Sequence, residues 1–334
     1  MMNKHGILLI NLGTPENYSL KAIRRYLRQF LSDWRVIDLN FFLRFFLVNF
    51  IILPFRSKKT AAAYQKIWST EGSPLLNNSN RIKEALAREL GENYQVELGM
   101  RYGTPSIKTA LSQFNNCDKI SVLPLFPQYS SAATGSAISE FLKAYTNQWN
   151  IPNMTIKRDF YNDPNFIRAY AEIIQKNIVK KNPDVILFSY HSLPERHLIK
   201  SKCRMECSSN GTCGDIQEAN QYCYKAQCYV TSALLAKALH LTSNQYRVAF
   251  QSRLGKTPWI GPYTDVVLPQ LIQEGIKNIA VVCPSFIVDC LETLEEINIR
   301  ARSQWEMLGG ETFTFIPCLN DEPEWIKALA VIVK

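Results

Sequence analysis

Short apolar runs, each followed at once by polar or turn residues, recur along this chain. Such a run is typical of a strand that is buried on both faces, as in a parallel sheet. Segments with helical periodicity separate the runs, and strands that alternate with helices predict an α/β fold with helices on both faces of the sheet. The predicted strands are Ile7–Ile10, Val96–Met100, Lys119–Leu125, Thr155–Phe160, Val185–Phe188, Arg247–Phe250 and Asn278–Cys283.

The length of 334 residues favours two domains, and each half of the chain holds at least three predicted strands. Two doubly wound domains with parallel sheets satisfy this pattern. A polar stretch before Pro152 marks the boundary, so we expect lobes over residues 1–150 and 151–309. The C-terminal segment, 310–334, is expected to join the first lobe.

The formal net charge of +9 favours an acidic partner, which can be nucleic acid, anionic lipid or a ligand that carries carboxylates. Nucleic acid is the weakest of the three, because the sequence shows no zinc finger, aromatic RNP pattern or long basic tract. No apolar run reaches about 18 residues and no signal peptide is recognised, so we expect a cytoplasmic protein. In that compartment the nine cysteines are expected to be thiols or metal ligands rather than disulfides.

The most apolar segment is Leu39–Arg56, which is rich in phenylalanine and too short to span a bilayer. Two interpretations remain open. The first, slightly favoured, is a buried core helix. The second is an exposed apolar lip that touches a membrane or admits an apolar ligand, and the basic residues Arg35, Lys58 and Lys59 that flank it suit anionic head groups.

His191 follows the apolar strand Val185–Phe188, at the end of the sheet where open α/β folds bind ligands. Asp289, Glu292 and Glu296 lie at helical spacing after the strand Asn278–Cys283, so we expect them to share one helix face. A neutral histidine beside Glu292 can bind a divalent metal or pass protons near neutral pH. The alternatives are a structural histidine and an acidic first helical turn, with Glu295 and Glu296 solvated.

Two cations, Arg101 and Arg253, also follow predicted strands. Arginine binds carboxylates with two parallel hydrogen bonds, although ordinary surface ion pairs explain both residues equally well. Aromatic residues are expected on the same rim, which suits a large, flat, apolar ligand with acidic tails; they are Tyr102, Tyr129, Tyr190, Trp259 and Phe286.

The loops at these strand ends resemble those of ferrochelatases. The motifs that carry the resemblance are Asn11-Leu12-Gly13-Thr14-Pro15, Met100-Arg101-Tyr102-Gly103, Pro124-Leu125-Phe126-Pro127-Gln128-Tyr129-Ser130, His191-Ser192-Leu193-Pro194, Phe250-Gln251-Ser252-Arg253, Pro258-Trp259-Ile260-Gly261-Pro262 and Asp289-Cys290-Leu291-Glu292-Thr293-Leu294. They occur in the family's order from Ile7 to about Trp325. The resemblance implies two Rossmann-like lobes of the chelatase type and insertion of Fe²⁺ into protoporphyrin IX, the last step of haem synthesis.

By the same resemblance, His191 and Glu292 are the pair that binds iron and handles protons. Arg101 and Tyr102 are expected to contact the porphyrin, Trp259 and Phe286 to flank its macrocycle, and the segment 39–56 to form a lip that rests on the inner face of a membrane. The sequence departs from some relatives at Cys290, where they carry a second histidine, and at Phe126, where they carry a tyrosine.

Five of the nine cysteines lie within residues 203–228, in a segment rich in Ser, Asn and Gly. Clustered cysteines in a reducing compartment indicate metal or iron–sulfur ligation. The chain resembles a bacterial subgroup of ferrochelatases with an internal [2Fe–2S] segment. Its expected ligands are Cys203, Cys207, Cys213 and Cys228, with Cys223 as the alternative fourth ligand. A zinc site of four thiolates and a segment without metal remain open.

Two other functions remain open at this point. One is a module that binds haem or porphyrin, or senses iron, without turnover. The other is a related cobalt chelatase, whose usual pattern lacks the segment Pro124–Tyr129. Glu292 beside His191 favours an enzyme, because a binding module needs no proton path.

Overall fold

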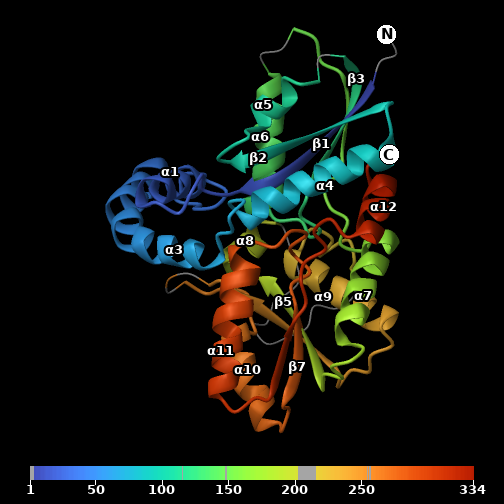
Figure 1. Ribbon diagram of the computed structural model, residues 1–334. Coiled ribbons are helices and arrows are strands. Elements are labelled where there is room, and N and C mark those ends of the chain that lie inside the picture. The colour runs from blue at the N-terminus through green and yellow to red at the C-terminus, as the bar shows by residue number, and fades with distance from the viewer. Residues whose placement is uncertain (1–3, 115, 147–148, 202–215, 254, 256) are drawn as a thin grey trace. The chain divides into compact units, whose positions relative to one another are not determined.

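The computed structural model describes residues 4–114, 116–146, 149–201, 216–253, 255 and 257–334 (Figure 1). The chain divides into two compact units. Unit 1 comprises residues 1–126, 130–159 and 320–334, and unit 2 comprises 127–129 and 160–319. The boundary between the two domains that was predicted from the sequence lies at residue 150.

Unit 1 holds a four-stranded parallel sheet in the order β2-β1-β3-β4. Its strands are β1 (Lys4–Gly13), β2 (Tyr94–Tyr102), β3 (Cys117–Pro124) and β4 (Asn153–Ile156). Its helices are α1 (Leu20–Leu31), α2 (Phe41–Phe46), α3 (Leu53–Ile67), α4 (Pro74–Leu90), α5 (Ile107–Leu111), α6 (Ser136–Tyr145) and α12 (Pro323–Ile332), with π-helical segments η1 (Leu47–Ile52) and η2 (Ser131–Gly135). The C-terminal α12 packs on α4.

Unit 2 repeats this plan with the order β6-β5-β7-β8, again fully parallel. Its strands are β5 (Val185–His191), β6 (Tyr246–Gln251), β7 (Asn278–Val282) and β8 (Thr312–Phe315). Its helices are α7 (Pro164–Ile178), α8 (Glu195–Lys200), α9 (Tyr224–Ala238), α10 (Thr264–Gln273) and α11 (Arg302–Met307), with a π-helix η3 (Glu292–Ala301). In Figure 1, α10 stands beside α11 and α7 beside α9, in agreement with their contacts.

The strand order creates a switch point in each sheet. The chain leaves β5 toward β6 on one side, and β7 returns on the other side of β5. Connections that depart in opposite directions leave a crevice outside the carboxyl ends of the two central strands, where α/β proteins bind their ligands. In unit 2 this crevice lies where β5 ends at His191 and the chain leaves β7.

The expected α/β fold with parallel sheets is confirmed, and the differences concern strand ends and one strand. The fourth strand of the second sheet, β8, was not predicted. The predicted strand Thr155–Phe160 is the shorter β4, Asn153–Ile156. Arg101 and Tyr102 lie within β2 rather than in the loop after it. These ends differ because ladder hydrogen bonds, which the apolar pattern does not report, decide where a strand stops.

Buried apolar side chains fill both faces of each sheet. Ile7, Leu8, Leu9 and Ile10 are fully buried, as expected for a strand covered on both sides. In unit 2, one core joins β5 and β7 to α10, η3 and α11, with Trp305 at its base. This packing anchors η3, the helix that carries Glu292.

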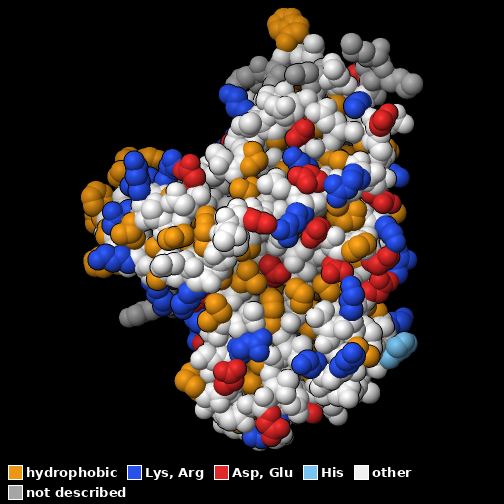
Figure 2. Space-filling view, viewed as in Figure 1, with side chains coloured by type: hydrophobic (Ala, Val, Ile, Leu, Met, Phe, Trp, Pro, Cys, Tyr) orange, Lys and Arg blue, Asp and Glu red, His pale blue; other side chains and the backbone are white. Residues whose placement is uncertain are grey.

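The phenylalanine-rich segment is exposed, so the slightly favoured expectation of a buried core helix was wrong. No residue of α2 is buried, and Phe42 and Phe55 are 81% and 79% exposed. Val48, Ile52 and Leu53 anchor the segment against Leu31, which leaves the phenylalanines outside. We call residues 39–56 the lip; Figure 2 shows apolar and basic side chains gathered over α1 and α3. Within the described residues, no helix has the length and apolar character needed to cross a membrane.

Candidate functional site

His191 is the last residue of β5, and three hydrogen bonds hold it there. Its backbone N–H donates to Ser285 Oγ at 3.2 Å, and its carbonyl accepts the Tyr224 hydroxyl at 2.8 Å. Its ring nitrogen Nδ1 lies 2.5 Å from the carbonyl oxygen of Ser192. Ser285 follows β7 and Tyr224 opens α9, so both sides of the switch point position this residue.

The contact with Ser192 selects one tautomer of the neutral imidazole. A carbonyl oxygen only accepts hydrogen bonds, so Nδ1 carries the proton that it donates. The other nitrogen, Nε2, therefore keeps its lone pair. His191 is only partly buried, so this atom is available as a base or as a metal ligand.

Two carboxylates of η3 share the neighbourhood of His191. The Glu296 carboxylate interacts electrostatically with both His191 and Glu292. It accepts hydrogen bonds from the Ser252 backbone N–H at 2.9 Å and from the Ser252 hydroxyl at 2.5 Å. Gln251, at the end of β6, donates to the Glu292 carbonyl at 2.8 Å. The ends of three strands thus supply or position the histidine and both acids.

Burial raises the pKa of Glu296 above its ordinary value, and the repulsion of Glu292 adds to the rise. The hydrogen bonds from Ser252 and the charges of Arg300 and His191 oppose it. A carboxylate whose pKa is raised holds a proton more readily than an ordinary one, as is common at functional sites.

The acidic residues differ from their sequence-based assignments. Asp289 precedes η3 and is buried, where it accepts the Thr293 hydroxyl at 2.9 Å. Glu295 is also buried and pairs with Arg300 at 2.8 Å, so it is not solvated. Glu296, for which solvation was the open alternative, is a member of the cluster, together with Glu292 on the same helix. Helical spacing did place Glu292 and Glu296 together, but it does not show the partners that hold Glu295 and Glu296, which are Arg300 and Ser252.

Two predicted aromatic residues lie close to this cluster. The ring of Phe286 stands 6.3 Å from that of His191 in an edge-to-face arrangement. Trp259 is partly buried, and its backbone pairs with Pro194 in the loop that follows His191. Tyr190, by contrast, is fully buried and bonds to Ser232 at 2.8 Å, so its expected place on the rim was wrong.

The other predicted residues of unit 2 have structural partners. Arg253 forms an ion pair with Asp265 at 2.7 Å and lies over the ring of Tyr263. The partly buried Tyr129 donates its backbone N–H to Gln227 Oε1 at 2.7 Å. Neither contact shows a ligand role.

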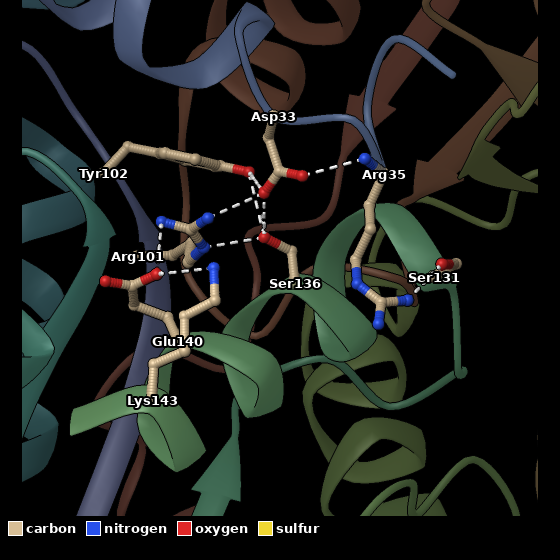
Figure 3. A network of polar contacts seen from close by, with 8 residues as sticks. All are labelled: Asp33, Arg35, Arg101, Tyr102, Ser131, Ser136, Glu140 and Lys143. Carbon is tan, nitrogen blue, oxygen red and sulfur yellow. Dashed lines mark hydrogen bonds and ion pairs between the residues drawn. The ribbon is translucent and has the colours of Figure 1, made fainter. Parts of the chain in front are cut away.

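In unit 1, Arg101 and Tyr102 belong to a polar network centred on Asp33 (Figure 3). Asp33 Oδ2 accepts the Arg101 guanidinium at 2.7 Å, the Tyr102 hydroxyl at 2.9 Å and the Ser136 hydroxyl at 2.5 Å. Tyr102 is fully buried, and the Arg101 side chain is only 14% exposed. The network therefore ties α1 and α6 to the end of β2.

Burial alone raises the pKa of Asp33, because it penalises the charged carboxylate. The hydrogen bonds from Ser136, from the Arg35 backbone and from Tyr102, together with the charge of Arg101, outweigh that effect. The pKa of Asp33 is therefore held below its ordinary value, and the carboxylate is the stable form at neutral pH.

The cysteine-rich segment falls largely outside the described residues. Cys203, Cys207 and Cys213 lie there, whereas Cys223 and Cys228 are described and fully buried. Burial raises the pKa of the Cys228 thiol well above its ordinary value. Over the described ranges, no group of three or more His, Cys, Asp or Glu side chains is arranged to hold a metal ion.

Comparisons with known proteins agree over the whole chain. The profile of the family described as Ferrochelatase matches residues 4–334. The chain is 57% identical over 330 residues to the ferrochelatase of Legionella pneumophila (strain Lens), covering 99% of this chain and 98% of that protein. It is 52% identical over 335 residues to the ferrochelatase of Coxiella burnetii (strain Dugway 5J108-111), covering 99% of this chain and 94% of that protein.

Two solved structures share the fold at low sequence identity. SirB from Bacillus subtilis with Fe³⁺ superposes with a TM-score of 0.53 at 12% identity, covering 99% of this chain and 94% of that one. DR2241 from Deinococcus radiodurans, a multi-domain protein with structural similarity to chelatases, gives 0.52 at 11% identity, covering 99% of this chain and 55% of that one. They support a chelatase-like α/β fold.

The Asp33 network predicts a specific dependence of stability on pH. Asp33→Asn keeps the side-chain shape but removes the closer carboxylate partner of Arg101, leaving only Glu140 at 3.6 Å, and losing one member of a buried pair costs about 3 kcal/mol. We expect that loss in the free energy of urea unfolding at about pH 7. Because the folded pKa is lowered, the contribution of Asp33 is present above its unfolded pKa near 4 and is lost as pH falls through the folded value.

The difference between wild type and variant should therefore shrink as the pH falls below about 4 and vanish below the folded pKa of Asp33. The control is Glu71→Gln, which removes an exposed partner of Arg81 and should cost less than about 1 kcal/mol. If the difference in free energy of unfolding between wild type and Asp33→Asn were the same at about pH 7 and well below about pH 4, this account would be contradicted.

Proposed function

The chain belongs to the ferrochelatase family, and on that premise we propose that it inserts Fe²⁺ into protoporphyrin IX at the His191 end of the unit 2 sheet, giving protohaem in the last step of haem synthesis. The activity is that of a metal-inserting lyase. Fe²⁺ and the porphyrin are both substrates. Two pyrrole N–H protons leave as the four nitrogens take the metal.

The observation that carries the proposal is the ring of His191, held by the contact of Nδ1 with the Ser192 carbonyl oxygen, in the neighbourhood of the Glu292 and Glu296 carboxylates. Nε2 accepts a pyrrole proton or holds the arriving Fe²⁺. The three hydrogen bonds of His191 to Ser285, Ser192 and Tyr224 keep its ring oriented. Glu292 and Glu296 receive the proton, and Glu292 is the carboxylate that shares the arriving metal with His191. The pKa of Glu296 is raised by burial, which makes this carboxyl a better proton acceptor than an ordinary carboxylate.

The substrate contacts are part of the same proposal. Phe286 and Trp259 flank the macrocycle. The edge-to-face contact of Phe286 with His191 supports this, as does the pairing of Trp259 with Pro194 in the loop after His191. Tyr129 contributes to the rim of the porphyrin site. Arg101 contacts the porphyrin with its exposed fraction, whereas the buried Tyr102 acts through Asp33.

His191→Ala tests the assignment. We expect the rate of Fe²⁺ insertion, followed by haem absorbance, to fall at least about 100-fold, as when a general base is lost. The circular dichroism spectrum should be unchanged. The control is His240→Asn, an exposed histidine at φ 55° that asparagine tolerates, and it should retain full activity.

Full activity of His191→Ala would remove the central assignment. Porphyrin binding by the wild type without turnover would instead indicate a binding module, and a preference for Co²⁺ over Fe²⁺ a cobalt chelatase.

The cysteine segment is proposed to hold a [2Fe–2S] cluster, whose ligand set is four thiolates. Cys203, Cys207 and Cys213 are three of them. Of the two candidates for the fourth, Cys228 has a raised thiol pKa, which opposes the thiolate that a metal requires. Cys223 is equally buried, but it caps the N-terminus of α9, where the helix dipole favours a thiolate, so we propose Cys223 as the fourth ligand. When bound, the cluster supplies a centre that cross-links the segment.

Visible spectra of freshly purified variants decide between these ligands. We expect wild type to show charge-transfer bands that reductant bleaches, Cys223→Ala to lose them, and Cys228→Ala to keep them. Cys283→Ala, a buried cysteine outside the segment, is the control that should keep them. A colourless wild type with bound zinc by elemental analysis would contradict the cluster.

Peripheral contact of the lip with a membrane is proposed from its exposure. Eight large apolar side chains between Phe41 and Phe55 are more than about two-fifths exposed, and basic residues flank them. An apolar surface of this kind gains free energy by entering lipid. We assign the enzyme to the cytoplasmic face of the cell membrane.

A vesicle co-sedimentation assay tests this contact. Replacing Phe42 and Phe55 together with alanine removes two of the most exposed rings, each worth about 1.5 kcal/mol or more if buried in lipid. We expect affinity for phosphatidylcholine vesicles to fall at least about tenfold. Trp149→Ala removes an aromatic ring that is 98% exposed outside the lip, and it should leave binding unchanged. Equal losses in both variants would contradict the lip.

A further inference from the structure

A cationic pocket of about 590 Å³ lies in unit 1, between α1, the turn after it and α6. Its volume is in the range of small-molecule sites. Five of its lining side chains are basic and one is acidic; the basic ones are Arg25, Arg28, Arg35, Arg101 and Lys143, and the acid is Asp33. This charge imbalance means that the pocket attracts an anion.

Asp33 does not neutralise the pocket as a whole. Its carboxylate is committed to Arg101, with Ser136 and Tyr102 completing the network (Figure 3). The nearest acid to Lys143 is Glu140, at 4.0 Å and 42% exposed, so that pair is weak. The pocket therefore keeps a net positive charge after its internal pairs are counted.

Two guanidinium groups in particular face neutral partners. Arg28 donates Nε to Asn49 Oδ1 at 3.0 Å, and Arg35 donates Nη1 to Ser131 Oγ at 3.0 Å. The Nε atom of Arg35 is buried and has no hydrogen-bond partner among the described residues. A buried donor without a partner is costly, and an acceptor oxygen in the pocket removes that cost. Guanidinium groups prefer carboxylate or phosphate oxygens.

The pocket is continuous with the lip. Asn49, the partner of Arg28, belongs to η1 within the lip, and α1 packs on both η1 and α3. The turn that carries Arg35 leads directly into the lip, and Val36 and Ile37 pack on its anchoring residues. Trp34 lines the pocket, is 56% exposed and lies under the Arg35 guanidinium. A half-exposed tryptophan beside cations is typical of the interface between membrane and water.

We propose that this pocket binds the phosphate of an anionic phospholipid headgroup while the lip enters the bilayer. This assignment rests on the proposed membrane contact of the lip. The lip supplies binding to any bilayer, and the pocket supplies selectivity for anionic lipid, because Arg28, Arg35 and Lys143 repel the choline cation of a zwitterionic headgroup and attract a headgroup with net negative charge.

The experiment compares the full chain on vesicles of phosphatidylcholine alone and on vesicles that also contain phosphatidylglycerol. The pocket variants are Arg28→Ala, Arg35→Gln and Lys143→Ala. Their matched controls are Arg88→Ala on α4 and Lys108→Ala on α5, exposed residues of the same unit that do not line the pocket. Each pocket variant should lose about fivefold in affinity for the anionic vesicles, the effect of about 1 kcal/mol per charge near the surface. Each control should change it by less than about twofold.

Neutral vesicles separate this proposal from that of the lip. The pocket variants should bind phosphatidylcholine as wild type does, whereas the lip variant loses affinity for both vesicles. If wild type binds neutral vesicles and gains nothing from phosphatidylglycerol, the pocket assignment fails and the lip stands. Equal losses in Arg88→Ala and Arg28→Ala would overturn the pocket in favour of diffuse surface charge.

A final measurement determines the binding of soluble glycerol 3-phosphate to the protein by calorimetry. Competition between glycerol 3-phosphate and anionic vesicles supports a shared phosphate site. The headgroup assignment would be overturned if the pocket variants lost the binding of glycerol 3-phosphate and kept the wild-type affinity for vesicles. That result would indicate a soluble phosphate ester as the ligand.

Discussion

The order of strands in the second sheet is the constraint on which the functional site depends. Because β5 lies between β6 and β7, the carboxyl ends of these strands meet at one edge of the sheet. His191, Ser252 and Ser285 come from three different loops, and yet hydrogen bonds and charge connect them with Glu296 on η3. The buried packing of η3 on β7 and α10 keeps the acids in place. A reacting histidine is therefore oriented by rigid elements on both sides.

The first unit uses a buried carboxylate for a comparable purpose. Asp33 gathers Arg101, Tyr102 and Ser136 from β2 and α6 and fixes the turn that leads from α1 into the lip. That turn also presents Arg35 to the cationic pocket. The buried Asp33 carboxylate thus stabilises the turn beside the lip, which is the surface that we propose contacts lipid. Such a carboxylate is effective because every oxygen contact is charge-assisted or donated by a buried hydroxyl.

Much of the fold was predictable from particular residues. The run Val185–Phe188 indicated a buried strand, and the structure has β5 there, over Val185–His191. Strand ends were less predictable, as Arg101 and Tyr102 inside β2 illustrate. Helical spacing placed Glu296 on one face with Glu292, but its contacts with Ser252 and His191 were missed because these residues lie on other loops, far away in the chain. Exposure of the lip was also misjudged, since an apolar segment has the same composition whether it is buried or not.

The sequence by itself determined the alternation of strands and helices, the parallel sheets and the position of His191 at a strand end. These depend on local periodicity and on burial, which each segment encodes on its own. Its family motifs also determined the chemistry of the chain. Only the tertiary structure decided that Asp33 binds Arg101 and Tyr102, that Glu296 joins His191 and Glu292, and that the lip lies outside beside a cationic pocket. Each of these depends on contacts between residues far apart in the chain, whose partners no local pattern specifies.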